Sequence, residues 1–260
     1  MATTETIIKC PYCGSDNVTK AGKSPNGAQK CTCRNPECPH TTFQLSYTYM
    51  GSKPGIEFEV LKMAINGSGV RDTARVLGVS CDFVISVLKK KGEWNQQVNI
   101  NYIRSHQNPS EIEIDVLLIE EDSIEVEGAE MDEMWSYVHD KSQQCWLWHA
   151  IDHQTGEVLA YTFGRRKDEV LKELLGLLKP FDIQKVYADA HYSYEKFLGS
   201  DKVVSSKKNT QRIERVHLSL RTWVKRLARK TICFSKTLLM HKAVVGLCIN
   251  VKIFGRPLRV

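Results

Sequence analysis

A single glutamate lies in a strongly basic C-terminal segment. From Lys202 to the end of the chain, Glu214 is the only acidic side chain, and it sits between Arg212 and Arg215. A surface that binds phosphates has no electrostatic use for a carboxylate, whereas a metal centre within that surface needs one. These residue types therefore favour metal-dependent phosphoryl transfer, as in nucleases and transposases. An ion-paired glutamate on a helix is the alternative.

Metal-dependent phosphoryl transfer needs several carboxylates, because two divalent cations about 4 Å apart serve the attacking and leaving oxygens. Asp132 lies in a predicted strand, and Asp189 ends another. On a strand, Glu130 would share the face of Asp132, and Glu133 would point the other way. Composition alone does not choose Asp132 and Asp189 over the other acids of this region: Glu130, Glu133, Asp152 at a predicted turn, Asp168 at a predicted helix start, Asp182 and Asp201.

The N-terminal segment has the spacing of a metal-binding module. Five of the nine cysteines fall between Cys10 and Cys38, and Cys10-Pro11-Tyr12-Cys13 is a CxxC knuckle. Two tight cysteine pairs predict a structural Zn²⁺ site in a zinc ribbon or finger over 1–50, with no open position for catalysis. The expected ligands are Cys10, Cys13, Cys33 and Cys38, with Cys31 and His40 as alternative ligands. Reduced thiols in a loop are the alternative to a metal site.

Residues 55–92 have the periodicity of a helix-turn-helix. Ala74 would lie at the closest packing point, Gly78 at the turn, and Ser80 would cap a second helix over 81–91. That helix would enter the major groove of DNA. The candidate DNA contacts in this domain are Arg71, Arg75, Ser86, Lys89 and Lys90. A helical hairpin that only packs against the rest of the chain is the alternative.

The segment 129–253 alternates strands and helices. We expect strands over 129–138, 144–151, 157–163, 184–189 and 202–205, and helices over 167–178, 194–198 and 209–230. This order predicts a ribonuclease-H-like mixed sheet as the catalytic core of a multi-domain α+β chain. The first and fourth strands of such a sheet are neighbours, so Asp132 and Asp189 would meet at one edge, which the last helix could cross with Glu214.

Charge is unevenly distributed along the chain, whose formal net charge is +6. Residues 111–127 are acidic without Lys or Arg and fall in a predicted linker, 93–128, with room for one strand or helix around 112–119. The basic segment after Lys202 predicts contact with nucleic acid. The sequence has neither an apolar run long enough to span a membrane nor a secretory signal. We therefore expect a cytoplasmic, nucleoid-associated protein without a membrane partner.

Several blocks resemble the transposase of the IS-one type insertion-sequence family, in the fused form with zinc module, helix-turn-helix and catalytic core. They are Ala129–Trp135, Tyr187–Ala190 followed by Tyr194, Ser206–Arg215, Leu218–Arg221 and Phe234–Lys236. The resemblance implies a DDE triad of Asp132, Asp189 and Glu214 with Mg²⁺ or Mn²⁺. Arg221, two helical turns after Glu214, would clamp a phosphate. Further DNA contacts would be Lys208, Arg212 and Arg215. Residues 252–260 depart from the family pattern.

The resemblance implies a DNA transposase that acts as a dimer or higher oligomer on DNA. It would bind the terminal inverted repeats, hydrolyse a strand at each end, and join the 3′-hydroxyl to target DNA without a covalent protein–DNA intermediate. One alternative is a tyrosine recombinase with Tyr192 or Tyr194 as nucleophile and no metal requirement. Another is a DNA-binding regulator with an inert core. His191, His217 and Lys208 would either position phosphates or lie on a basic surface.

Overall fold

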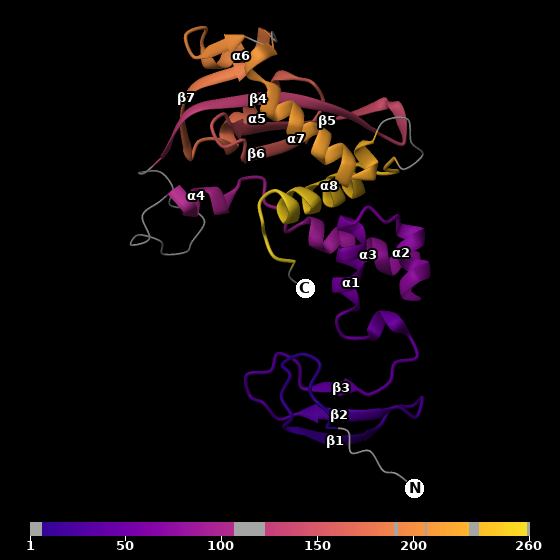
Figure 1. Cartoon of the computed structure of the whole chain (residues 1–260). Coiled ribbons are helices and arrows are strands. Elements are labelled where there is room, and N and C mark those ends of the chain that lie inside the picture. Colours follow the sequence, from indigo (N-terminus) through magenta and orange to yellow (C-terminus); the bar gives the residue numbers. More distant parts are fainter. Residues whose placement is uncertain (1–6, 107–122, 190–191, 206, 229–233, 259–260) are drawn as a thin grey trace.

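The computed structural model describes residues 7–106, 123–189, 192–205, 207–228 and 234–258. The strand or helix considered around 112–119 lies outside these residues. Figure 1 shows a small sheet near the N-terminus, a group of helices, and a large sheet with its own helices at the opposite end. None of the described helices combines the length and the apolar character that a membrane crossing requires.

The N-terminal module is a three-stranded antiparallel sheet in the order β1-β2-β3. Its strands are β1 (Val18–Lys23), β2 (Gln29–Cys33) and β3 (Thr42–Gln44). The turn from β1 to β2 contains Gly27 at φ 80°, a backbone conformation that glycine adopts without strain. The small core of the module consists of Cys10, Cys31, Cys33 and Phe43.

The predicted helix-turn-helix is confirmed. Its helices are α1 (Ile56–Ile65), α2 (Val70–Leu77) and α3 (Cys81–Gly92). Ala74 is buried, and Gly78 ends α2 at φ 65°, where a side chain would be strained. Ser80 is the N-cap of α3, because its Oγ accepts the backbone N–H of Phe83 at 3.1 Å.

The predicted mixed sheet is also confirmed, with strand order β6-β5-β4-β7-β8. Strands β4, β5 and β6 are antiparallel neighbours, whereas β7 pairs with β4 in parallel and β8 pairs with β7 in parallel. The bounds are β4 (Ile124–Val138), β5 (Asp140–Asp152), β6 (Val158–Gly164), β7 (Phe181–Ala188) and β8 (Val203–Ser205). Short connections make β4–β6 a meander, and the parallel strands follow helical crossovers.

Strand β4 begins earlier than predicted, at Ile124 instead of residue 129. Residues 124–127 alternate between buried Ile or Val and exposed Glu, and they pair with β7 from Phe181 onward. The exposed glutamates made this part look like the end of an acidic linker. The period of two, with one apolar face, is the pattern of a half-buried strand.

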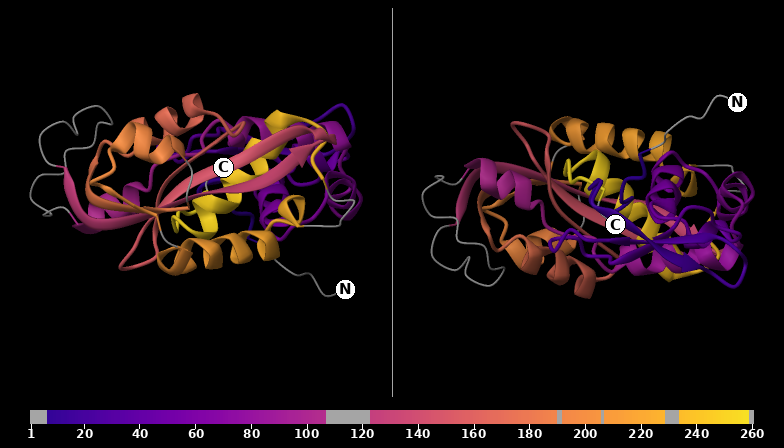
Figure 2. Two further views of the ribbon diagram at one scale, coloured as in Figure 1. Left: turned by 90° about the horizontal axis from the view of Figure 1, so that it is seen from above. Right: turned by 90° about the horizontal axis from the view of Figure 1, so that it is seen from below.

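Helices cover both faces of the large sheet, as Figures 1 and 2 show. One face packs against α5 (Asp168–Leu177) and α6 (Tyr192–Leu198), with Leu171, Leu174 and Tyr194 in its core. The other face packs against α7 (Gln211–Trp223) and α8 (Leu238–Lys252), with Ile213, Leu220 and Val245 in its core. Because helices cover both faces, the loops and the candidate carboxylates lie at the edges of the sheet.

The C-terminal helices differ from the prediction of one helix over 209–230. Helix α7 ends at Trp223, where Val224 is extended, and a single 3-10 turn (Lys225–Leu227) follows. No secondary structure was predicted for residues 238–252, which form α8. This helix is apolar almost all round because it is buried on two sides. Its Val245 packs in the sheet core, whereas Met240 and Val244 pack with α1–α3.

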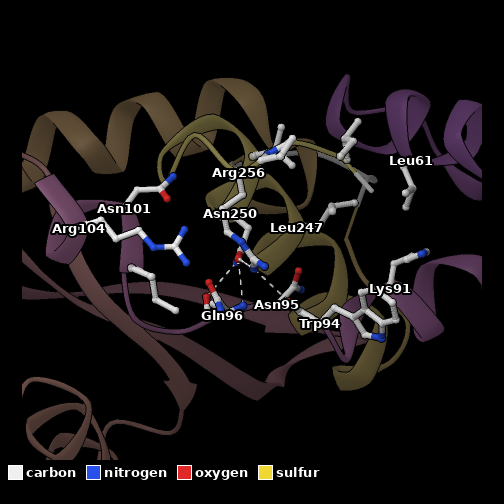
Figure 3. Close-up of a pocket in the computed structure, with 14 residues that line it drawn as sticks. Leu61, Lys91, Trp94, Asn95, Gln96, Asn101, Arg104, Leu247, Asn250 and Arg256 are labelled. Atoms are coloured by element: carbon white, nitrogen blue, oxygen red, sulfur yellow. Dashed lines mark hydrogen bonds between the residues drawn. The ribbon is translucent and has the colours of Figure 1, made fainter. Parts of the chain in front are cut away.

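A polar joint links the helix-turn-helix to the core. The side chain of Asn250 on α8 accepts from the backbone N–H of Gln96 at 3.0 Å and donates to the Gln96 carbonyl at 2.9 Å. Arg256 donates to Asn250 Oδ1 at 2.7 Å and to the Trp94 carbonyl at 3.2 Å. These side chains line a cavity of about 220 Å³ (Figure 3). Residues of α4 (Ile100–His106), including Asn101 and Arg104, line the same cavity.

Candidate active site and metal centre

Four sulfur atoms gather in the N-terminal module. The Sγ atoms of Cys10, Cys13, Cys33 and Cys38 lie within 4.8 Å of one another. Cys10 and Cys38 are 3.7 Å apart, and Cys13 and Cys33 are 3.6 Å apart. Tetrahedral thiolates with Zn–S bonds of about 2.3 Å require sulfur–sulfur separations of roughly 3.8 Å. The four-cysteine cluster therefore has the geometry of a zinc site with no open position.

The two alternative ligands lie outside this cluster. Cys31 is fully buried in the core of the small sheet. The ring of His40 packs against Tyr12 in a tilted arrangement, with ring centroids 4.0 Å apart. Both residues therefore have structural surroundings of their own, and the four expected cysteines are the ones that converge.

The two candidate aspartates lie level with each other in the large sheet. Strand β7 pairs with β4 as far as Ala188 opposite Met131, and the next residues along the chain are Asp189, just after β7, and Asp132 on β4. Asp189 is exposed, and its charge is one of the causes that raise the pKa of Asp132. The parallel pairing thus brings together carboxylates that are far apart in the sequence.

Helix α7 brings the third carboxylate to the same edge. Glu214 is exposed on its first turn, and it lines a cavity of about 430 Å³ together with Asp132. The cavity is lined by Asp132, Glu133, Trp135, Trp146, Glu214, His217, Leu218 and Arg221. Asp189 is not among these lining residues. The cavity thus combines two of the three expected carboxylates with a guanidinium group and an apolar wall.

The surroundings of Asp132 suit a bound cation. Burial raises the pKa of Asp132 to about 7, and the nearby charges of Glu133 and Asp189 act in the same direction. The backbone N–H of Glu133 donates to Asp132 Oδ1 at 2.7 Å and opposes the shift. Where burial and neighbouring carboxylates disfavour an anion, a divalent cation stabilises it, and carboxylate oxygens are the ligands that Mg²⁺ and Mn²⁺ prefer.

The competing acids have other partners. Both carboxylate oxygens of Glu130 are engaged within the fold, and its side chain is 1% exposed. Glu133 Oε1 lies 3.5 Å from Arg166 Nε, but Glu133 also lines the cavity that contains Asp132 and Glu214. Asp152 is the predicted turn residue and accepts from the backbone N–H of Gln154 at 2.9 Å. Asp168 begins α5 and accepts from Lys196 on α6 at 2.7 Å.

His217 is neither a surface residue nor part of a basic face. It is buried one turn after Glu214, and its Nδ1 lies 3.7 Å from Asp132 Oδ2. Its ring is 4.8 Å from His149, which stands opposite Asp132 on β5. Burial, followed by the charge of Arg221, lowers the pKa of His217 to about 4. His191 lies outside the described residues.

Some site residues had no signal in the sequence, and others had a weak one. His149 is adjacent to Asp132 only through the β4–β5 register, which no single segment encodes. Trp135 and Trp146 are cross-strand partners in the same pair of strands. His217 was already a candidate, either to position phosphates or as a basic-surface residue, and it lies three residues after Glu214, where residues on a helix share a face.

The predicted DNA contacts of the helix-turn-helix are exposed. They are Arg71 and Arg75 on α2, and Ser86, Lys89 and Lys90 on α3. Arg75 donates to Asp72 at 3.0 Å on the same helix. Lys91, at the end of the same basic run, is buried instead, with its Nζ 4.5 Å from the centre of the Trp94 ring. The basic run thus divides into an outward pair and one lysine that packs inward.

The predicted contacts in the basic C-terminal segment also lie at the surface. Lys208, Arg212 and Arg215 are exposed, and Arg221 is partly buried where it lines the cavity. Arg212 also donates to the backbone carbonyl of Gln154 in the β5–β6 turn. Of these four cations, Arg221 is the one that lines the cavity with Asp132 and Glu214.

Tyr194 is not placed as a nucleophile. Its side chain is 1% exposed, in the core beneath α6, and burial raises its pKa well above the usual value. A tyrosine that attacks DNA must reach solvent and substrate. The side chain of Tyr192 lies outside the described residues.

Comparison with known proteins assigns two regions of the chain. A family model described as IS1 transposase matches residues 126–255, half of the chain, and one described as the InsA C-terminal domain matches residues 47–92. The insertion element iso-IS1n protein InsB of Shigella dysenteriae is 51% identical over 125 residues, which are 48% of this chain and 95% of that protein. The insertion element IS1 4 protein InsB of Escherichia coli (strain K12) is 44% identical over 124 residues, 48% of this chain and 74% of that protein.

Among solved structures, the catalytic core domain of BIV integrase matches with a TM-score of 0.33 and 12% identity, over 48% of this chain and 83% of that chain. That similarity is too distant to bear on function. The two family models and the InsB proteins are sufficient by themselves to assign the family of this chain. The chain belongs to the IS1 transposase family, with a DDE-type transposase domain behind a helix-turn-helix domain that implies DNA binding.

Proposed function

We propose that this chain cleaves DNA at the terminal inverted repeats of an insertion sequence and joins the freed ends to target DNA. Two observations support the proposal: Asp132 and Glu214 line one cavity, and Asp189 directly follows the end of β7, where β7 pairs with β4 beside Asp132. Divalent cations bound there would activate a water oxygen and stabilise the leaving oxygen. The four-cysteine cluster would hold a structural Zn²⁺.

The chain's own residues would hold the DNA in place. Arg221 and the exposed cations Lys208 and Arg215 would bind phosphates on either side of the scissile bond. Trp135 and Trp146 would form the apolar wall against a sugar or base beside that phosphate. The helix-turn-helix, with α3 in the major groove, would select the repeat sequence.

The reaction would proceed in two displacements at phosphorus. Water attacks the phosphate at the repeat tip, the P–O3′ bond breaks, and the strand end leaves as a 3′-hydroxyl beside a 5′-phosphate. That hydroxyl then attacks a target phosphodiester, forms a new P–O3′ bond and releases a target 3′-hydroxyl. Two repeat ends must be held together, so we expect a dimer or higher oligomer on DNA.

The test is strand cleavage and joining with labelled duplexes that carry the repeats flanking the gene. Wild type is compared with Glu214→Gln in Mg²⁺ or Mn²⁺, with Glu195→Gln on α6, also an exposed glutamate, as the matched control. We expect metal-dependent nicking by wild type and by the control, and its loss in Glu214→Gln without loss of DNA binding.

Other outcomes would contradict the proposal in distinguishable ways. Unchanged nicking by Glu214→Gln would remove Glu214 from the site. A protein-linked DNA product formed without metal would indicate a tyrosine nucleophile. Repeat binding without cleavage by any of the three proteins would indicate a DNA-binding regulator.

A further inference from the structure

Glu130 is a buried carboxylate two residues before Asp132 on β4. Its side chain is 1% exposed. One oxygen, Oε1, lies 2.8 Å from Nδ1 of His153 in the β5–β6 turn. The other, Oε2, accepts the backbone N–H of Ile213 on α7 at 2.9 Å. A buried charge is costly unless it is paired and hydrogen-bonded, so this arrangement needs both partners.

The contact with Ile213 satisfies the start of helix α7. Ile213 is the third residue of α7, and the first N–H groups of a helix have no partner within it. The N-cap residue, Thr210, makes no side-chain capping hydrogen bond, so Glu130 supplies a cap from the neighbouring strand. A negative charge at a helix N-terminus is also favourable to the helix dipole. The residue directly after Ile213 is Glu214.

The β5–β6 turn closes on the same place. His153 donates its backbone N–H to Gly128 on β4 at 2.8 Å, and its ring lies 4.4 Å from that of Tyr187 on β7. Arg212 at the start of α7 donates to the carbonyl of Gln154. Strand β4, strand β7, the turn and the helix that carries Glu214 are therefore tied together at the level of Glu130.

We propose that Glu130 is a positioning residue: it fixes the first turn of α7 against β4 so that Glu214 faces Asp132. It is not a metal ligand, because its two oxygens are committed to Ile213 and His153 and it is fully enclosed. The inference rests on the proposed function, since it assigns Glu214 and Asp132 to one metal site. It also explains why an acid so close to Asp132 takes no direct part in that site.

The test compares Glu130→Gln with Glu130→Ala. The glutamine amide oxygen can still accept from Ile213 N–H, whereas alanine has no acceptor to offer. Removing such a supporting partner typically costs about 10–100-fold in activity or metal affinity. We expect Glu130→Ala to nick repeat DNA about 10–100-fold more slowly and to need more Mn²⁺ for half-maximal rate, and Glu130→Gln to stay within a few-fold of wild type. Repeat binding should be unchanged in both.

The matched control is Ser136→Ala. Ser136 is also a buried, hydrogen-bonded residue on β4, but its partners are Cys145 on β5 and His241 on α8. Its replacement should leave the Mn²⁺ requirement at the wild-type value even if the protein melts at a lower temperature. Amide hydrogen exchange at Ile213 gives a readout that needs no activity: protection should fall in Glu130→Ala and persist in Glu130→Gln.

Two results would overturn the inference. Equal loss of nicking in Glu130→Gln and Glu130→Ala would mean that the carboxylate itself is required, as for a metal ligand. Wild-type nicking and Ile213 protection in Glu130→Ala would mean that the hydrogen bond positions nothing. If wild type fails to nick DNA with any metal, the proposed function fails, and the exchange measurement still decides whether Glu130 holds α7.

Discussion

Asp132 shows how burial and charge prepare a residue for a cation. Its pKa is raised to about 7 first by burial and then by acids that include Glu133 and Asp189. The sequence places Asp132 on a strand, but burial of a side chain depends on what lies over it. Here the cover is α7 with His217, from a segment more than eighty residues away. The candidate triad could be predicted from the resemblance, whereas the environment of each carboxylate could not.

At the same scale, the four-cysteine cluster predicts the zinc content of the protein. Wild type should carry one Zn²⁺ per chain, and Cys13→Ser should lose it, because one sulfur of a closed tetrahedral site is missing. Cys81→Ser is the matched control, since Cys81 is also exposed but lies outside the cluster. The measurement is zinc by elemental analysis after dialysis. Equal zinc content in Cys13→Ser and Cys81→Ser would exclude the assigned site.

At the scale of elements, local signals predicted most of the fold. The Gly78-Val79-Ser80 turn indicated the helix-turn-helix, because a glycine that ends one helix and a serine that caps the next act within a few residues. The meander β4–β6 and the crossover to β7 followed from short apolar runs and turns. The start of β4 was missed because its exposed glutamates masked the alternation. Helix α8 was missed because burial on two sides removes the polar stripe that marks a surface helix.

The exposed lysines at the end of α3 are expected to contact DNA phosphates. Lys89→Ala and Lys90→Ala should each weaken repeat binding. Each variant neutralises one phosphate fewer, so binding releases about one counterion fewer and depends less steeply on salt. Lys62→Ala is the control, because Lys62 is an exposed helical lysine that pairs with Glu59 on α1. Binding is measured by fluorescence anisotropy over a salt series. An unchanged salt slope in both α3 variants would place the DNA elsewhere.

At the scale of the whole molecule, α8 joins the DNA-binding helices to the catalytic core. Its side chains belong to two hydrophobic clusters at once, one with the sheet and one with α1–α3. The N-terminal module has a separate core of its own around the cysteines. The position of α3 relative to the carboxylates is thus set by a shared core and by the polar joint at Asn250. That arrangement depends on contacts across the chain, so the sequence could predict the domains but not how they are held.

We propose that three distant segments of this molecule form one cation site. Asp189 tests it most directly, since it is the member that register alone places beside Asp132. The measurement is repeat nicking by Asp189→Cys in Mg²⁺ and in Mn²⁺, with Asp182→Cys on the same strand as control. A thiolate accepts Mn²⁺ more readily than Mg²⁺. We expect Asp189→Cys to be inactive in Mg²⁺ and to recover activity in Mn²⁺, while Asp182→Cys works with both. Equal activity of Asp189→Cys in the two metals would contradict it.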